Sequence, residues 1–77
     1  MIKINPSNVR PLAEKIMQNE TKSIKFIQKQ GDNILCRFGY EFGNNSDAKL
    51  IKELAVSKLQ KAANLPEQCG EIFVTIA

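Results

Sequence analysis

The 77-residue chain carries a net charge of +3, with 43% hydrophobic and 25% charged residues, a composition typical of one soluble globular domain over residues 1–77. It has no histidine and no apolar run near the roughly 18 residues of a membrane span, and its opening MIKINPSNVR is unlike a signal peptide. We therefore expect a cytoplasmic protein that makes no membrane contact, and the mild positive charge favours acidic partners, either nucleic acid or a protein surface.

The first half of the chain predicts a strand, a helix and a hairpin. Residues 1–4 alternate apolar and polar side chains, which indicates a short strand. From Val9 to about Gln18 apolar residues recur at three- and four-residue steps, which predicts a helix with Asn8 as its N-cap and Pro11 in its first turn. Residues 23–29 and 34–42 indicate two strands, and QGDN at 30–33 is typical of a hairpin turn between them.

The second half predicts a longer helix and a last strand. GNNSD ends the preceding strand and offers Asn45, Ser46 or Asp47 as the helix cap. The apolar stripe of this helix is expected to be Leu50, Ile51, Leu54, Ala55, Leu59, Ala62 and Ala63. The residues expected outside the stripe are Lys49, Lys52, Glu53, Ser57, Gln60 and Lys61. The helix ends near Asn64 and Pro66, and residues 71–77 form the last strand.

The element order βαββαβ predicts an α+β, ferredoxin-like fold. In this fold a four-stranded antiparallel sheet carries two helices on one face. With two right-handed crossovers, we expect the first and third strands in the middle of the sheet. The other face of the sheet is then open to solvent or to a partner.

The third predicted strand partly resembles the RNA recognition motif family. RFGYEF at residues 37–42 has the aromatic, glycine and aromatic core of that family's third-strand signature. It lacks the glycine after the basic residue, and Glu41 stands where the family has an aliphatic residue. The first strand also has no aromatic residue. Heavy-metal carriers with this element order need a Cys-x-x-Cys loop after the first strand, which NPSN does not supply.

Alternation along the third strand indicates which of its sides faces the core. One side carries Ile34, Cys36, Phe38, Tyr40 and Phe42, and the other carries Leu35, Arg37, Gly39 and Glu41. Burying an unpaired charge costs several kcal/mol, whereas burying a large apolar side chain gains about 1.5–3 kcal/mol. We therefore expect the aromatic side to face the helices, as part of the central strand of the core. The same inner layer would include Ile2, Ile4, Ile24, Phe26, Ile72, Val74 and Ile76.

The opposite face then forms the candidate binding surface. It is expected to show Lys3, Lys25, Ile27, Lys29, Leu35, Arg37, Gly39, Glu41, Phe73 and Thr75. Within it we predict the partner-binding residues Lys3, Lys25, Ile27, Lys29, Arg37, Glu41 and Phe73. Phe73 supplies a ring on which a base can stack. A solvated face without function, and the outer helix residues as a second surface, remain alternatives.

Catalysis is not expected. The commonest general base near neutral pH is absent, and the carboxylates Glu14, Glu20, Asp32, Glu41, Asp47, Glu53, Glu67 and Glu71 make no recognised motif. Cys36 and Cys69 cannot form a zinc site by themselves, and we expect buried or idle thiols. Cys69 lies just before the last strand, a position that allows it to be exposed. The sequence thus predicts neither an enzyme nor a cofactor.

The remaining interpretation is a small non-catalytic binding protein that occupies the surface of a larger protein partner. Short, cytoplasmic single domains without motifs are common among phage and mobile-element inhibitors of host machinery, including anti-CRISPR proteins, and this association has no motif behind it. The alternative is a nucleic-acid-binding regulator that uses the basic open face. A third interpretation is a homodimer through the open faces or through the strands at residues 71–77, which are apolar on both sides.

Overall fold

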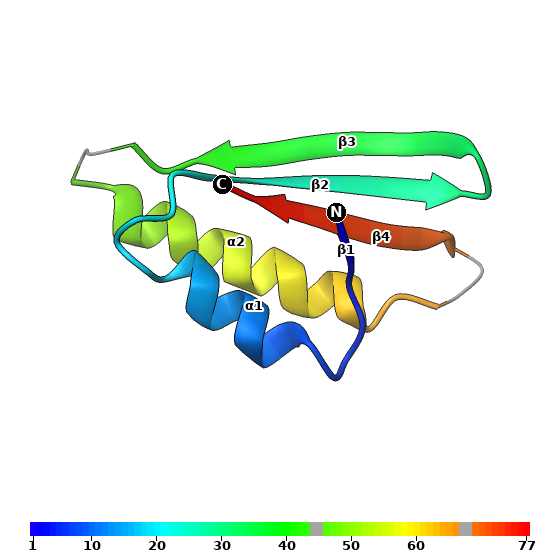
Figure 1. Ribbon diagram of the computed structural model, residues 1–77, viewed down its shortest axis with the longest axis horizontal. Helices are drawn as coiled ribbons and strands as arrows, with labels where there is room; N and C mark the ends of the chain where they lie inside the picture. Colours follow the sequence, from blue (N-terminus) through cyan, green and yellow to red (C-terminus); the bar gives the residue numbers. More distant parts are fainter. Residues whose placement is uncertain (44–45, 67–68) are drawn as a thin grey trace.

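The computed structural model describes residues 1–43, 46–66 and 69–77. Its elements are β1 (Ile2–Lys3), α1 (Val9–Ile16), β2 (Ser23–Gln30), β3 (Asn33–Glu41), α2 (Ala48–Ala63) and β4 (Glu71–Ile76). Both helices lie on the same side of the four-stranded antiparallel sheet (Figure 1). The predicted ferredoxin-like α+β fold is thereby confirmed. Asn45, a predicted helix cap, and the carboxylate of Glu67 lie outside the described residues.

The strand order differs from the prediction. It is β1-β4-β2-β3, so β4 and β2 are central and β1 and β3 are the edges. β4 pairs with β2 from Glu71 to Ile76 and with β1 at Phe73 and Val74, and its inward-facing Ile72 and Val74 are buried. β1 has two residues and forms only a short edge. Placing the first and third strands in the middle was therefore wrong, and so was a homodimer through β4, because both of its edges are already paired.

The first helix begins as predicted. Asn8 is the N-cap residue, and Pro11 lies in the first turn, where its missing N–H interrupts no helical hydrogen bond. The helix ends at Ile16, slightly before the predicted Gln18. Beyond its end, the hydroxyl of the buried Thr21 donates a hydrogen bond of 2.6 Å to the carbonyl oxygen of Lys15, which satisfies one of the free carbonyls of the last turn.

The second helix is rotated relative to its predicted stripe. Its N-cap is Asp47. Leu50 and Leu54 are 60% and 56% exposed, whereas Lys52, expected on the outer face, is only 7% exposed. The Lys52 ammonium donates a hydrogen bond of 2.7 Å to the carbonyl oxygen of Gln18, just beyond α1, and lies 5.5 Å from the centre of the Phe42 ring. Its long aliphatic stem fills apolar space while its charge reaches a polar partner.

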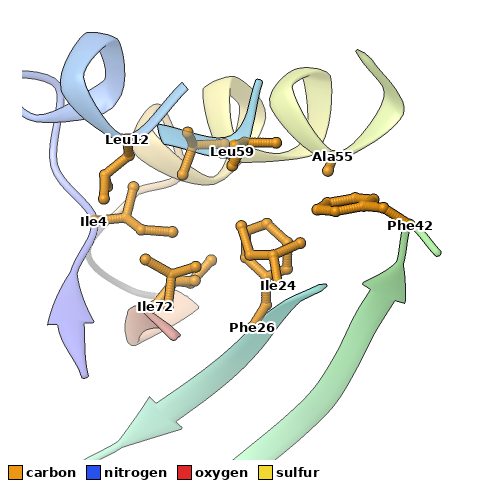
Figure 2. Close-up of a cluster of buried hydrophobic side chains, with 10 residues drawn as sticks. Ile4, Leu12, Ile24, Phe26, Phe42, Ala55, Leu59 and Ile72 are labelled. Atoms are coloured by element: carbon orange, nitrogen blue, oxygen red, sulfur yellow. The ribbon is translucent and has the colours of Figure 1, made fainter. Parts of the chain in front are cut away.

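The core lies between the sheet and the two helices (Figure 2). Figure 2 shows side chains from β2 and β4 meeting Leu12 of α1 and Leu59 and Ala55 of α2, with Phe42 closing one end. The predicted inner layer is confirmed for the buried residues Ile4, Ile24, Phe26, Phe42, Ile72 and Val74. Ile76 is half-buried and packs against this core.

The helix layer covers the inner side of β3 only in part. Phe38 and Tyr40 are half-buried, and Cys36 is exposed, contrary to the prediction. Eight and sixteen helical residues span about 12 and 24 Å, whereas a nine-residue strand spans about 30 Å. The β2–β3 hairpin therefore extends past the helices (Figure 1), which leaves Cys36 uncovered.

A bulge near the hairpin turn corrects the predicted facing of Ile34. The register shifts at Gln28 and Lys29, so that Gln28 faces Cys36 but Lys29 faces Ile34, with Leu35 as the extra residue. An extra residue on one strand reverses the side to which the following residues point. Ile34 is therefore opposite a residue of the open face and 44% exposed. Ile2 of the short edge strand β1 pairs with the buried Val74, so it lies on the inner side as predicted, but it is exposed at this edge of the sheet.

Candidate functional site

The open face is assembled in rows that cross the sheet. One row runs from β1 to β3 through Lys3, Phe73, Ile27 and Arg37, each paired with the next. A neighbouring row pairs Thr75 with Lys25 and Lys25 with Gly39, and a third pairs Glu71 with Lys29. Residues paired in this way share a face of the sheet. The structure thus brings the seven predicted partner-binding residues to one face, with Glu41 at the end opposite Ser23.

The centre of this face is apolar and its surround is charged. Ile27 and Phe73 are half-buried neighbours on the two central strands, whereas Lys3, Lys25, Arg37 and Glu41 are exposed. Alternation along β2 and β4 explains the pattern, because the buried Phe26 and Val74 point to the opposite face. The arrangement places two apolar side chains inside a rim of charge.

Two contacts within the face alter its electrostatics. The Lys29 ammonium lies 5.6 Å from the centre of the Phe73 ring, a cation–π contact. The Lys3 ammonium lies 3.5 Å from a carboxylate oxygen of Glu71, and both side chains are largely exposed. Glu71 was missing from the predicted surface although alternation with Phe73 places it there. The face therefore has four basic side chains, Lys3, Lys25, Lys29 and Arg37, and two acidic ones, Glu41 and Glu71.

Gly39 leaves space on the β3 side of this face. A depression is lined there by residues of β2 and β3, among them Lys25, Ile27, Arg37, Gly39 and Glu41. A Cβ atom at Gly39 would lie 2.7 Å from the carbonyl oxygen of Ile24, closer than van der Waals contact allows. The close approach of β2 to β3 therefore leaves no room for a side chain at position 39, which requires glycine there.

The described residues offer little for catalysis or metal binding. In the described part of the chain, no three acidic, cysteine or histidine side chains form a metal-binding group. Cys36 and Cys69 are both free thiols. Cys69 is half-buried, and its backbone carbonyl oxygen accepts a hydrogen bond of 2.6 Å from the side-chain amide of Gln28. This hydrogen bond joins β2 to the segment that precedes β4.

The alternative surface on the outer side of α2 loses one of its predicted members. Lys49, Glu53 and Lys61 are exposed, but the buried Lys52 is not available to a partner. Outside the prediction, Leu50 and Leu54 add exposed apolar area to α2. Neither leucine could be assigned to the surface from the sequence, because both fit the spacing of an apolar stripe.

Comparison with protein-family models, with curated proteins and with solved structures finds no match to this chain. Over the described ranges, neither helix has both the length and the apolar character needed to cross a membrane. The chemistry of the surface is therefore the basis for assigning a function.

Proposed function

We propose that the protein is a small non-catalytic binding protein that docks its open sheet face on an acidic surface of a larger protein. The observation that carries the proposal is the half-buried pair Ile27 and Phe73 surrounded by exposed charges. Protein interfaces commonly have an apolar centre and a polar, solvent-accessible rim. The excess of basic over acidic side chains on the rim favours an acidic partner.

Nucleic-acid binding is the second candidate, favoured by the same basic side chains. Single-stranded nucleic acid is usually held by charge together with aromatic rings on which bases stack. Phe73 is half-buried, and Lys29 lies against its ring at 5.6 Å. A base could stack there only after Lys29 moved, and the other described aromatic residues of the sheet lie on the inner side. A protein partner needs no such rearrangement.

An inhibitory role fits this mode of binding. A domain of 77 residues acts on a larger machine most simply by covering one of its surfaces. We therefore propose that the larger partner belongs to host machinery and that this protein is a phage or mobile-element inhibitor, similar in kind to anti-CRISPR proteins. The support for this part is the small size and the binding face, with no motif behind it.

The test is affinity capture from a host lysate with three tagged forms of the protein. They are the wild type, the double variant Lys25→Glu with Lys29→Glu, and the control Lys49→Glu with Lys61→Glu. The two double variants change the net charge equally but lie on the sheet face and on the exposed side of α2. We expect a protein that the wild type and the α2 control retain in nuclease-treated lysate and that the sheet-face variant loses.

Capture that is equal for all three forms, or absent for all three, would contradict the proposal. The nucleic-acid alternative is tested in parallel by mobility shift with single-stranded RNA and DNA. A shift that weakens steeply as salt increases and disappears in the Lys25 and Lys29 variant would favour that alternative.

A further inference from the structure

We propose that two copies of this protein pair through the free edges of β3 and form a continuous eight-stranded sheet. β3 is a nine-residue edge strand, in contrast to the two-residue edge β1. A long edge strand presents a row of backbone donors and acceptors that can pair with another chain. This inference does not rest on the function proposed for the open face, although it uses Arg37 and Glu41 of that face.

The register of β2 and β3 determines which backbone groups are free. The Phe42 amide donates a hydrogen bond of 2.9 Å to the carbonyl oxygen of Lys22. In an antiparallel pair, residues that exchange hydrogen bonds alternate with residues that do not. Tyr40 and Phe38 therefore bond to β2, whereas Arg37, Gly39 and Glu41 direct their N–H and C=O groups outward. Ser23, which faces Glu41, agrees with this register because its backbone bonds to Ala77 instead.

The part of β3 that remains regular is centred on Gly39. The bulge at Leu35 interrupts the strand near the hairpin turn, and the ladder continues from Cys36 to Phe42. Antiparallel pairing of this segment with its own copy places Gly39 opposite Gly39 of the second copy. The outward backbone groups of Gly39 and of the residues two positions away then exchange hydrogen bonds across the two-fold axis.

This register makes the side chains complementary. Arg37 lies opposite Glu41 of the second copy, and Glu41 lies opposite its Arg37, which gives two ion pairs on the open face. Among the described residues, neither side chain has an ion pair within its own chain. On the inner side, Phe38 lies opposite Tyr40 of the second copy, and both rings are half-buried in the single chain. Opposite charges and aromatic pairs across strands are stabilising.

The second helix supplies apolar area beside the same edge. Leu50, Leu54 and Lys58 are spaced four residues apart, so they lie on one flank of α2. The Lys58 ammonium lies 5.0 Å from the centre of the Phe38 ring of β3, which places this flank next to the β3 edge. Leu50 and Leu54 are exposed in the single chain. Pairing through β3 brings the two copies of α2 side by side and covers these leucines.

The charge pairs allow a direct test by analytical ultracentrifugation. The variants are Arg37→Glu, Glu41→Arg and the combination of both, with Lys25→Glu as the control. Arg37 and Lys25 are both exposed on the open face, and their reversal changes the net charge equally, but Lys25 lies on β2 away from the edge. We expect the wild type and Lys25→Glu to sediment as dimers, with twice the 8.6 kDa chain mass.

Each single reversal at the edge places like charges opposite one another, so we expect Arg37→Glu and Glu41→Arg to sediment as monomers. The combined variant restores opposite charges and should recover the dimer. An equimolar mixture of the two single variants should also associate, because each then faces its complement. A wild type that stays monomeric at millimolar concentration would overturn the proposal, as would a dimer that the edge reversals leave intact.

Leu54→Glu provides a second test that does not involve the open face. Leu54 is exposed, so the variant should fold normally, as its circular dichroism spectrum would show, while its dimer dissociates at least tenfold more readily than that of the wild type. Leu65→Glu is the matched control, because Leu65 is also exposed but follows the far end of α2. Equal dissociation of both leucine variants would contradict the placement of the α2 flank at the interface. The Lys25 and Lys29 double variant tests the partner face by capture, whereas the edge reversals test β3 by sedimentation, so the two proposals can fail separately.

Discussion

Lys52 is a charged residue that lies in an apolar interior. Its ammonium reaches the Gln18 carbonyl and the Phe42 ring, and it connects α2 to the segment after α1. Replacing it removes a charge-assisted hydrogen bond and the packing of its aliphatic stem. The side chain therefore contributes to the fold rather than to the surface charge.

We expect Lys52→Ala to lower the free energy of unfolding by about 1–3 kcal/mol. Lys52→Met keeps most of the stem and should lose less. Lys49→Ala, at an exposed position of the same helix, should change stability by no more than about 0.5 kcal/mol. Urea denaturation followed by circular dichroism measures all three variants, and an equal loss for Lys49→Ala and Lys52→Ala would contradict the buried position of Lys52.

At the scale of the element, β3 changes character along its length. Phe42, just after the strand, is fully buried, Phe38 and Tyr40 are half-buried, and Cys36 is exposed. The helices cover only the end of the hairpin near Phe42, and β3 has a partner strand on one side alone. Side chains on the same side of β3 therefore differ in how much their burial contributes to the stability of the fold.

This gradient predicts different costs for truncation along one strand. Phe42→Ala should lower the free energy of unfolding by about 3–5 kcal/mol because it leaves a cavity in the core. Cys36→Ala should change it by no more than about 0.5 kcal/mol, and Phe38→Ala should fall between them. Chemical denaturation of the three purified variants gives the order, and a large loss at Cys36 would show that the hairpin end is covered.

For the whole molecule, pairing through β3 would couple stability to concentration. A partner subunit that binds only the folded chain raises the unfolding midpoint as protein concentration increases. We expect the thermal midpoint of the wild type to rise over a hundredfold increase in concentration. The midpoint of Arg37→Glu should stay constant over the same range. Scanning calorimetry compares the two, and a constant midpoint for both would contradict the dimer.

Much of this protein could be predicted from local patterns. The approximate bounds of the elements, the Asn8 cap and the side of the sheet that faces the helices follow from periodicity, from Pro11 and from the cost of burying Arg37 and Glu41. The same alternation collects the predicted binding residues on one face, which the structure shows as paired rows. The role of that face in binding a partner stays a prediction.

The amino-acid sequence by itself determined the element order, the fold class and the polarity of the two sheet faces, because these depend on neighbours two to four residues apart. The strand order, the rotation of α2 that buries Lys52 and exposes Leu54, and the bulge that reverses Ile34 were decided by the tertiary structure. Each of these three features depends on packing and pairing between segments that are far apart in the sequence. For β3 this meant an edge strand instead of the predicted central one, and Arg37, Gly39 and Glu41 lie at this edge as well as on the open face.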